Sequence, residues 1–366
     1  MGSLARTEAE LADAVRGANS PLRIVGGGTR WVGHVGPAEV LQTNGLSGVT
    51  LYEPGALTLV AGAGTPLAEV EALLASEGQR LPFEVPDMRG LLGGTGLSTL
   101  GGVVAANASG PRRVQVGACR DSLIGVRFVD GTGTVIKNGG RVMKNVTGYD
   151  LVKLMAGSHG TLGVLIEVSF KLLPVPEAAL TLILSGLDDA RAVGAMSAAL
   201  GSPYEVSGAA HWPGSGTFLR IEGFAASVAY RAGRLAALLA EFGSVTHEDD
   251  AATRWANVRD VTPFHGLTGD IWRVSVKPSD APMIAARSGA QALAYDWGGG
   301  LIWMLMQPGN DLRTRLGAFS GHATRLRGDG ADGIATFHPE APALNALAKG
   351  LREKFDPRGI LNFGLM

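Results

Sequence analysis

The sequence is poor in cysteine, in net charge and in long apolar runs. Its single cysteine, Cys119, excludes an intramolecular disulfide and excludes an iron–sulfur cluster held by several thiolates of this chain. Lys and Arg total 32 against 33 Asp and Glu, so no basic field favours nucleic acid. No run approaches the ~18 apolar residues of a spanning helix, and the acidic N-terminus lacks the core of a secretion signal. We therefore expect a cytoplasmic protein without direct membrane insertion, any membrane association coming through partner subunits.

Glycine, in contrast, is abundant. It accounts for 54 of 366 residues, about twice the usual share of ~7%. Clusters stand at residues 26–28, 101–102 and 157–163, and consecutive glycines can present bare N–H groups to an anion such as pyrophosphate. Each cluster alone is equally consistent with an ordinary tight turn, so the interpretation as one binding surface depends on all three. The nicotinamide fingerprint G-x-G-x-x-G would need glycine at Trp31, which disfavours NAD as the main cofactor.

The order of elements before residue 175 predicts an α+β domain. Residues 21–25 form an apolar strand that runs into the first glycine turn. A helix should follow, with Thr65 as its N-cap and Pro66 at its first position. Residues 123–137 alternate like a hairpin. The prolines of segment 174–176 mark a domain boundary, because proline stops strand pairing and stiffens a linker.

The pattern changes after that boundary. It continues as strand, alanine-rich helix, two strands, alanine-rich helix and strand, which is a ferredoxin-like βαββαβ order. The apolar run 301–306 has the length of a buried strand, and no internal repeat is apparent. A helix over 341–355 is expected to pack back on the first domain. The predicted domains are therefore 1–175, 176–330 and a returning segment, 331–366.

Taken in order and with their flanks, the glycine segments resemble a known superfamily. The segments are Arg23–Arg30 (RIVGGGTR), Ser98–Gly110 (STLGGVVAANASG), Lys144–Asp150 (KNVTGYD), Gly157–Val164 (GSHGTLGV) and the closing Phe355–Gly364 (FDPRGILNFG). They are similar to the flavin domain of the vanillyl-alcohol-oxidase, or PCMH-type, FAD-linked oxidoreductases. Within that superfamily the chain resembles the family of FAD-binding (E) subunits of bacterial glycolate oxidases.

The resemblance implies a PCMH-type FAD-binding domain of two subdomains, followed by a ferredoxin-like α+β cap domain. It also implies which residues contact FAD: Gly26, Gly27, Gly28 and Thr29 at the pyrophosphate, then Thr99, Gly101, Gly102, Asn107 and Ser109, and finally Gly157, Ser158, Gly160, Thr161, Gly163, Val164 and Ile166. Relatives that bind flavin covalently through the first turn carry histidine where Thr29 stands. We therefore expect noncovalent FAD, held by backbone N–H groups and the Thr29 hydroxyl.

Substrate chemistry is less visible in the sequence. Oxidation of a 2-hydroxy acid needs a cation for the carboxylate and a base for the hydroxyl proton. Arg273 is the candidate for this catalytic-site cation, since guanidinium binds carboxylate with a bidentate fork; a surface or interdomain arginine is the alternative. His211, His265, His322 and His338 are candidate bases, although no pattern distinguishes them. The spacing of ligands in a tetrahedral metal site is missing, and we expect no metal.

These observations favour an FAD-dependent oxidoreductase subunit. We expect it to take part in oxidising glycolate or another small 2-hydroxy acid within a complex, together with a second flavin subunit and an iron–sulfur subunit, and to be weakly active alone. One alternative is a self-sufficient flavin oxidoreductase acting on a 2-hydroxy acid or sugar acid. Another is a flavin-empty structural subunit. A cell-wall precursor reductase of the same superfamily is disfavoured, because the closing segment resembles the acid-oxidising branch.

Overall fold

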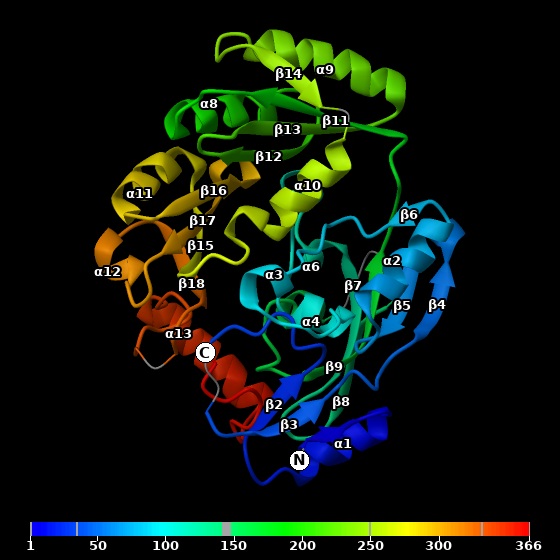
Figure 1. Cartoon of the computed structure of the whole chain (residues 1–366). Helices are drawn as coiled ribbons and strands as arrows, with labels where there is room; N and C mark the ends of the chain where they lie inside the picture. Colours follow the sequence, from blue (N-terminus) through cyan, green and yellow to red (C-terminus); the bar gives the residue numbers. More distant parts are fainter. Residues whose placement is uncertain (1, 34–35, 141–147, 249, 331, 366) are drawn as a thin grey trace.

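The computed structural model describes residues 2–33, 36–140, 148–248, 250–330 and 332–365. The sequence segment at 144–147, quoted above for its resemblance, lies outside these residues. Figure 1 shows an N-terminal domain, in blue to green, beneath a cap domain, in green to orange. The last part of the chain returns to the N-terminal domain, where both ends of the chain lie.

The N-terminal domain contains two main sheets. The smaller is parallel, with the order β1-β3-β2, and the larger is antiparallel, with the order β4-β5-β9-β7-β8. Strands β6 and β10 form a separate short antiparallel pair. The strands are β1 (Ser3–Leu4), β2 (Leu22–Val25), β3 (Glu39–Gln42), β4 (Val49–Glu53), β5 (Thr58–Gly62), β6 (Gln79–Arg80), β7 (Leu123–Val129), β8 (Val135–Gly139), β9 (Val164–Lys171) and β10 (Leu173–Pro174). The expected hairpin at 123–137 is β7 with β8.

Helices cover these sheets and enclose separate cores. They are α1 (Glu8–Gly17), α2 (Leu67–Ser76), α3 (Arg89–Leu92), α4 (Leu100–Ala105), α5 (Arg113–Val116), α6 (Cys119–Ser122) and α7 (Leu151–Met155), with a short 3-10 turn, η1 (Pro54–Ala56). Leu11 and Val15 of α1 pack with Leu41 of the small sheet. Helices α2, α4 and α7 bury their apolar faces against the large sheet in a second cluster, which includes Cys119. Burial raises the pKa of the Cys119 thiol, which is inert packing material here.

The start of α2 differs by one position from the sequence prediction. Pro66 is the cap residue and Leu67 the first helical residue. The Thr65 hydroxyl does not cap the helix, because it accepts a bond from the Gly48 amide at 2.9 Å and donates to the Gly62 carbonyl at 2.7 Å. This tertiary contact with the preceding turn prevails over the local capping preference.

The cap domain begins with the predicted ferredoxin-like unit. Its elements are β11 (Ala178–Leu184), α8 (Asp189–Leu200), β12 (Val206–Trp212), β13 (Gly216–Gly223), α9 (Ala225–Leu239) and β14 (Val245–Glu248), and its strands have the order β14-β11-β13-β12. The helix α10 (Ala251–Asp260) follows. The sequence prediction of βαββαβ for this stretch is confirmed.

A second unit with the same βαββαβ order follows, which the sequence analysis missed. Its elements are β15 (Asp270–Val276), α11 (Ala281–Ser288), β16 (Ala292–Asp296), β17 (Leu301–Met306), α12 (Leu312–Leu316) and β18 (Gly321–Arg327), with the 3-10 turns η2 (Thr262–Phe264), η3 (Pro278–Asp280) and η4 (Trp297–Gly299). Its strands, in the order β16-β17-β15-β18, continue the first unit's sheet through His211 opposite Tyr295. The apolar run 301–306 is β17, fully buried as predicted.

The two faces of the cap sheet have different partners. Helices α8, α9, α11 and α12 cover the outer face, and their core includes Trp272 and Val274 of β15. The other face meets the N-terminal domain, since Ile271 clusters with Met88 and Leu91 of that domain. Side chains alternate along a strand, so Arg273 shares the inner face with Ile271.

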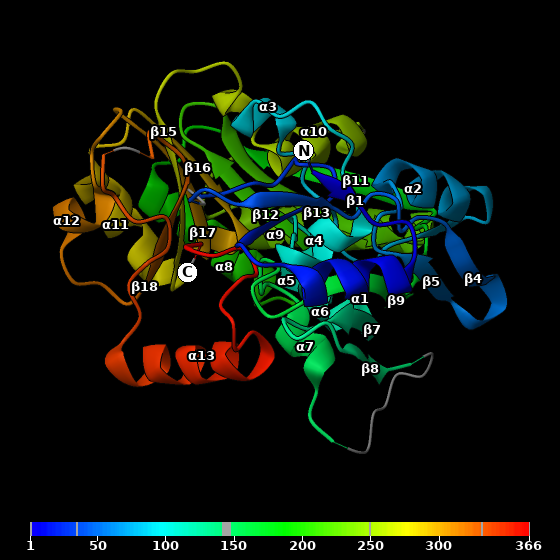
Figure 2. The same cartoon turned by 90° about the horizontal axis from the view of Figure 1, so that it is seen from below.

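The C-terminal segment returns to the small sheet after the helix α13 (Pro342–Phe355). Leu361 forms a bridge with Leu22, and Asn362 bonds to β2. We expected α13 to pack on the first domain, but the contact is limited to its C-terminal end, where the Phe355 ring lies 6.1 Å from Phe128. The rest of α13 extends away from the sheets, as Figure 2 shows. No helix within the described ranges is long and apolar enough to cross a membrane.

Candidate functional site

The glycine segments meet around two adjoining cavities of the N-terminal domain. One is lined by residues 24–32 together with Thr99, Gly102, Ala105, Ala106, His159, Asn362 and Leu365. The other is lined by Ile24, Gly26, Thr43, Ala63, Gly101, Gly102, Ala105, Ser158, His159, Gly160, Gly163, Val164, Leu165 and Asn362. The shared lining makes them one elongated site. Segments more than 100 residues apart in the sequence therefore form a single surface.

The turn after β2 supplies the donors of this site. Within the described residues, the main-chain amides of Gly26, Gly27, Gly28 and Thr29 donate no hydrogen bond, although all four residues line the cavity. Gly28 has a φ of 68°, and a Cβ at Gly26 would lie 2.5 Å from the Thr99 hydroxyl oxygen. Glycine is needed here both for the turn and for the close approach of α4. The result is a concave row of free N–H groups, which suits an oxyanion.

Arg30 places a positive charge directly beside this turn. Its guanidinium donates to the Ser98 hydroxyl at 2.5 Å, to the Pro86 carbonyl at 2.7 Å and to the Thr29 hydroxyl at 3.2 Å. Burial lowers the pKa of Arg30 to about 10, so the group stays charged at neutral pH. Arg30 was not among the residues predicted from the sequence, although its position directly after the glycine turn was a usable signal.

His159 and Asn362 complete the cavity and were also missed. Burial lowers the pKa of His159 to about 4, which keeps the ring neutral. The Asn362 amide donates to the His159 carbonyl at 2.7 Å, and its oxygen accepts from the Ile24 amide at 2.8 Å. Asn362 thus ties the glycine-rich third segment to β2. Its contacts span most of the chain, and no local pattern encodes them.

Not every residue expected at the cofactor lies in the lining. Gly26, Gly27, Gly28, Thr29, Thr99, Gly101, Gly102, Ser158, Gly160, Gly163 and Val164 do. Asn107 and Ser109 instead fasten the loop to α6: the Asn107 side chain accepts from the Arg120 amide and the Ser109 hydroxyl from the Cys119 amide, each at 3.0 Å. Gly157, Thr161 and Ile166 also stand outside the lining.

Two of the candidate histidine bases, His322 and His338, are neighbours, and the other two lie elsewhere. His211 is buried at the seam of the two cap units, where its Nδ1 lies 2.9 Å from the Thr217 hydroxyl. His265 bonds to the Asp260 carbonyl at 2.8 Å. His322 is on the edge strand β18, and the His338 ring contacts Phe319 at 5.4 Å. Among the described residues, no group of three or more His, Cys, Asp or Glu could hold a metal ion.

Arg273 lies on the inner face of the cap sheet, against Trp297. Its guanidinium carbon is 5.0 Å from the centre of the indole ring, and the indole N–H donates to the Gly110 carbonyl of the N-terminal domain at 3.1 Å. Burial, with a contribution from Arg113, lowers the pKa of Arg273 to about 10. The residue is therefore an interdomain arginine, and it is still charged at neutral pH.

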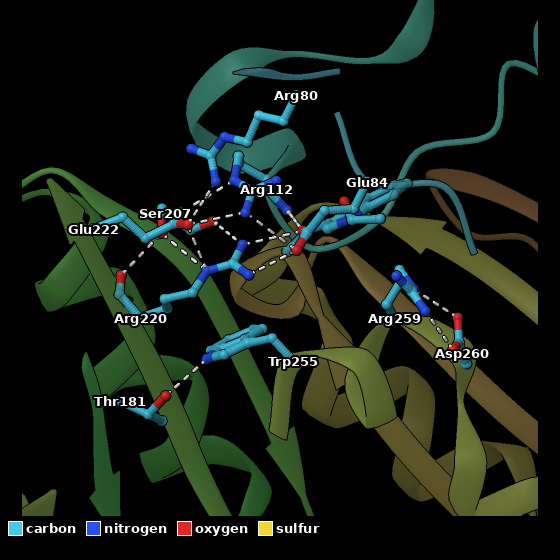
Figure 3. Close-up of polar contacts among 12 residues, drawn as sticks. Arg80, Glu84, Arg112, Thr181, Ser207, Arg220, Glu222, Trp255, Arg259 and Asp260 are labelled. Carbon is cyan, nitrogen blue, oxygen red and sulfur yellow. Dashed lines mark hydrogen bonds and ion pairs between the residues drawn. The ribbon is translucent and has the colours of Figure 1, made fainter. Parts of the chain in front are cut away.

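Elsewhere, a buried ion-pair network joins the two domains (Figure 3). Arg220 of β13 binds Glu84 of the N-terminal domain with both terminal nitrogens, at 2.7 and 3.0 Å. Arg112 binds Glu222 in the opposite direction, at 2.9 and 3.0 Å, and Arg80 adds a bond of 2.9 Å to Glu222. Bidentate pairs of this kind fix orientation as well as distance.

Burial alone would raise the pKa values of Glu84 and Glu222. The neighbouring guanidinium groups outweigh it, so both pKa values are lowered and both carboxylates stay ionised. The Arg220 guanidinium also lies 4.6 Å from the Trp255 ring centre, whose N–H donates to Thr181 at 2.9 Å. The network therefore fixes how the cap sits on the N-terminal domain.

Comparisons of sequence agree with this architecture. A family model described as "FAD binding domain" matches residues 3–139. The chain is 36% identical to "Glycolate oxidase subunit GlcE" of Escherichia coli K12 over 351 residues, which is 95% of this chain and 93% of that protein. It is 33% identical to "Glycolate oxidase subunit GlcD" of Bacillus subtilis 168 over 161 residues, covering 43% of this chain and 33% of that protein.

Comparisons of structure extend the likeness over the whole chain. An alkyldihydroxyacetonephosphate synthase matches with a TM-score of 0.73 at 16% identity, over 99% of this chain and 76% of that one. The VAO-type flavoprotein MtVAO615 of Myceliophthora thermophila C1 matches with a TM-score of 0.67 at 14% identity, over 98% and 77%. These show the fold, and the expected PCMH-type α+β class is confirmed. With the full-length similarity above, they establish that the chain belongs to the GlcE family of PCMH-type, FAD-dependent oxidoreductases.

Proposed function

We propose that this chain is the FAD-binding subunit of a complex that oxidises glycolate or a similar D-2-hydroxy acid. The observation that carries the proposal is the match to a glycolate oxidase subunit along 95% of the chain. The glycine-lined cavity supports it. The finer parts of the proposal are a second flavin subunit, an iron–sulfur subunit and the passage of electrons to them. The presence of a single cysteine fits an onward carrier on another chain.

The residues of the cavity fit FAD, the cofactor of this family. The free amides of Gly26–Thr29 would hold the pyrophosphate, with Arg30 and the Thr29 hydroxyl supporting the negative charge. Small residues along α4 and the 158–164 segment leave an elongated space for the rest of the molecule. Thr29 offers no nitrogen for a covalent link, so binding would be noncovalent. We propose domains at 1–175, 176–330 and 331–366, with FAD in the first.

Arg273 is the proposed cation for the substrate carboxylate. Bound FAD supplies the hydride acceptor in this chemistry. Arg273 would hold the acid by its carboxylate, in a fork that also fixes the direction of its hydroxyl-bearing carbon. Its inner-face position, between the cap and the N-terminal domain, supports this role, because ligand sites of two-domain proteins often lie at the domain boundary.

A self-sufficient flavin oxidoreductase remains the second candidate. The observation in its favour is Arg273 itself, since a chain that only relayed electrons would not need a cation for the acid. A flavin-empty structural subunit is disfavoured by the free amides of the first turn. Such a subunit would have no reason to keep donors without acceptors in a lined cavity.

The experiment is an anaerobic titration of the purified chain with glycolate and D-lactate, followed by flavin absorbance. We expect a yellow protein whose flavin stays oxidised until the partner subunits are added. Rapid bleaching without partners would establish the self-sufficient enzyme instead. A yellow protein that neither bleaches alone nor restores glycolate oxidation to a complex lacking this subunit would refute both.

A further inference from the structure

Two arginines from different domains contact one indole ring. Arg113, at the start of α5, has its guanidinium carbon 4.5 Å from the ring centre of Trp297, and Arg273 of β15 lies 5.0 Å from the same centre. Trp297 is itself held across the domain boundary by its bond to the Gly110 carbonyl. Trp297 has a φ of 54° and lies in a tight turn. In this turn the Asp296 carboxylate accepts a hydrogen bond from the Trp297 amide at 2.7 Å.

These two arginines differ from their neighbours in lacking acceptors. Within the described part of the chain, no side-chain hydrogen bond or ion pair is formed by Arg113 or Arg273, whereas Arg112 and Arg220 each bind a carboxylate. Both are half-buried, so water solvates them only in part. The N–H donors of these two guanidinium groups therefore have no acceptor among the described side chains and main-chain groups.

The carboxyl group that acts on Arg273 is Asp296, and the one that acts on Arg113 is Asp121, which is itself paired with Arg120 and Lys153. Asp296 is buried, and its pKa is raised to about 7, chiefly by burial and despite the opposing pull of Arg220 and Arg273. A large fraction of Asp296 is thus uncharged at neutral pH. Its side chain is also committed to the Trp297 amide. The space around the indole is left with an excess of positive charge.

A third basic group faces the same region. His322 of β18 lies opposite Ser275, two residues from Arg273 along β15. Burial and then the charges of Arg273, His338 and Arg113 lower the pKa of His322. The same repulsion acts on Arg273 from Arg113. Unpaired charges held together in this way are costly, and an anion between them would relieve the cost.

We propose that Arg113 and Arg273, aligned by Trp297, form one carboxylate-binding site between the two domains. It would take a small carboxylate, and under the proposed function, on which this assignment rests, that is the 2-hydroxy acid substrate. The new elements are Arg113 and Trp297. The flat indole keeps both guanidinium planes in place, so less side-chain freedom is lost when an anion binds. Since each domain contributes one arginine, the bound acid would also bridge them.

The test uses Trp297 as its reporter. The full chain, purified as it is produced, is titrated with glycolate, D-lactate, oxalate and inorganic phosphate at constant ionic strength while tryptophan fluorescence is followed. We expect a saturable change with the carboxylates, absent in Trp297→Phe. Arg113→Gln and Arg273→Gln should each weaken binding about tenfold or more, the scale of a charge-assisted bond. The affinity of Arg113→Lys should lie between those of the unaltered chain and Arg113→Gln, because lysine keeps the positive charge but cannot bind a carboxylate through two parallel hydrogen bonds.

The matched control is Arg6→Gln, an exposed arginine of the N-terminal domain whose charge does not act on Arg113 or Arg273 and which should bind like the unaltered chain. Unchanged carboxylate affinity in folded Arg113→Gln would overturn the proposal, as would phosphate binding as tightly as glycolate. The folded state of each variant is checked by its melting temperature. The readout does not involve flavin. A chain that holds FAD and restores a complex but binds no carboxylate would therefore refute this site and leave the proposed function intact.

Discussion

At the scale of single residues, the cofactor site depends on backbone freedom. The turn at Gly26–Thr29 directs its amides into a cavity because Gly28 adopts a left-handed conformation. Side chains contribute where they fix these main-chain groups. Arg30 lies beside the turn, and Asn362 joins β2 to the third segment. Donors prearranged in this way bind an anion without much further ordering.

Gly28→Ala should therefore weaken FAD binding and the fold together. A Cβ at this φ costs about 1–2 kcal/mol, although space for the methyl group exists. The matched control is Gly55→Ala: a Cβ there would meet no atom within 4 Å, as one at Gly28 would make only an ordinary contact of 3.9 Å with Val25, but the φ of Gly55 is not left-handed. The measurements are the flavin-to-protein absorbance ratio and the unfolding free energy in urea. Equal values for the two variants would contradict this account of the turn.

His159 makes the fold sensitive to acid. Its folded pKa is about 4, below the ordinary 6.5, so between these values the unfolded chain binds more protons. The contribution of neutral His159 to the free energy of unfolding is complete above pH 6.5 and is lost as the pH falls toward 4. At pH 5 the loss should be about 2 kcal/mol. His159→Asn, which tolerates the φ of 51°, should lose less stability between pH 7.5 and 5 than the unaltered chain. Urea titrations at both pH values measure this, with exposed His247→Asn as the control.

At the scale of elements, the cap is held by charge pairs that cross the domain boundary. Strand β13 of the cap contributes Arg220 and Glu222. Arg220 pairs with Glu84 of the N-terminal domain, and Glu222 pairs with Arg112 of that domain. Replacing such pairs wholly by apolar groups can be neutral, whereas removing one partner leaves a buried charge alone. The attachment of the cap to the N-terminal domain therefore depends on each charged residue of the network.

Glu222→Gln should destabilise the chain by about 3–5 kcal/mol, because Arg112 and Arg80 lose the negative charge and one of the two acceptor oxygens of their partner inside the interface. The control is Glu205→Gln. Glu205 also pairs with an arginine, but its side chain is 72% exposed, and its loss should cost less than about 1 kcal/mol. Chemical denaturation compares the two. A small effect at Glu222 would mean that the network is not an essential link between the domains.

The elements also show what the sequence could reveal. The glycine segments, the hairpin β7–β8 and the first βαββαβ unit follow local patterns and were predictable. The second unit was missed because α12, Leu312–Leu316, is too short to show helical periodicity. Arg113, Trp297 and Asn362 were missed for another reason. Their partners lie far away in the sequence, and pairing at such separations leaves no local signal.

At the scale of the whole molecule, the chain combines a cofactor-binding domain with a duplicated cap that closes over it. The fold and the full-length family match fit a flavin-holding subunit, and the carboxylate site would give it a direct contact with the acid. Ion pairs and an apolar cluster cross the boundary between the two domains. The account depends on FAD residing in this chain.

The most direct test of that claim is the flavin content of the chain purified alone. The protein is denatured, precipitated and separated from the supernatant, and FAD is quantified in both fractions. The account predicts an amount of FAD equimolar with the chain, all of it in the supernatant, as noncovalent binding requires. Colourless protein that takes up no added FAD would contradict it, and flavin retained in the precipitate would contradict the noncovalent assignment.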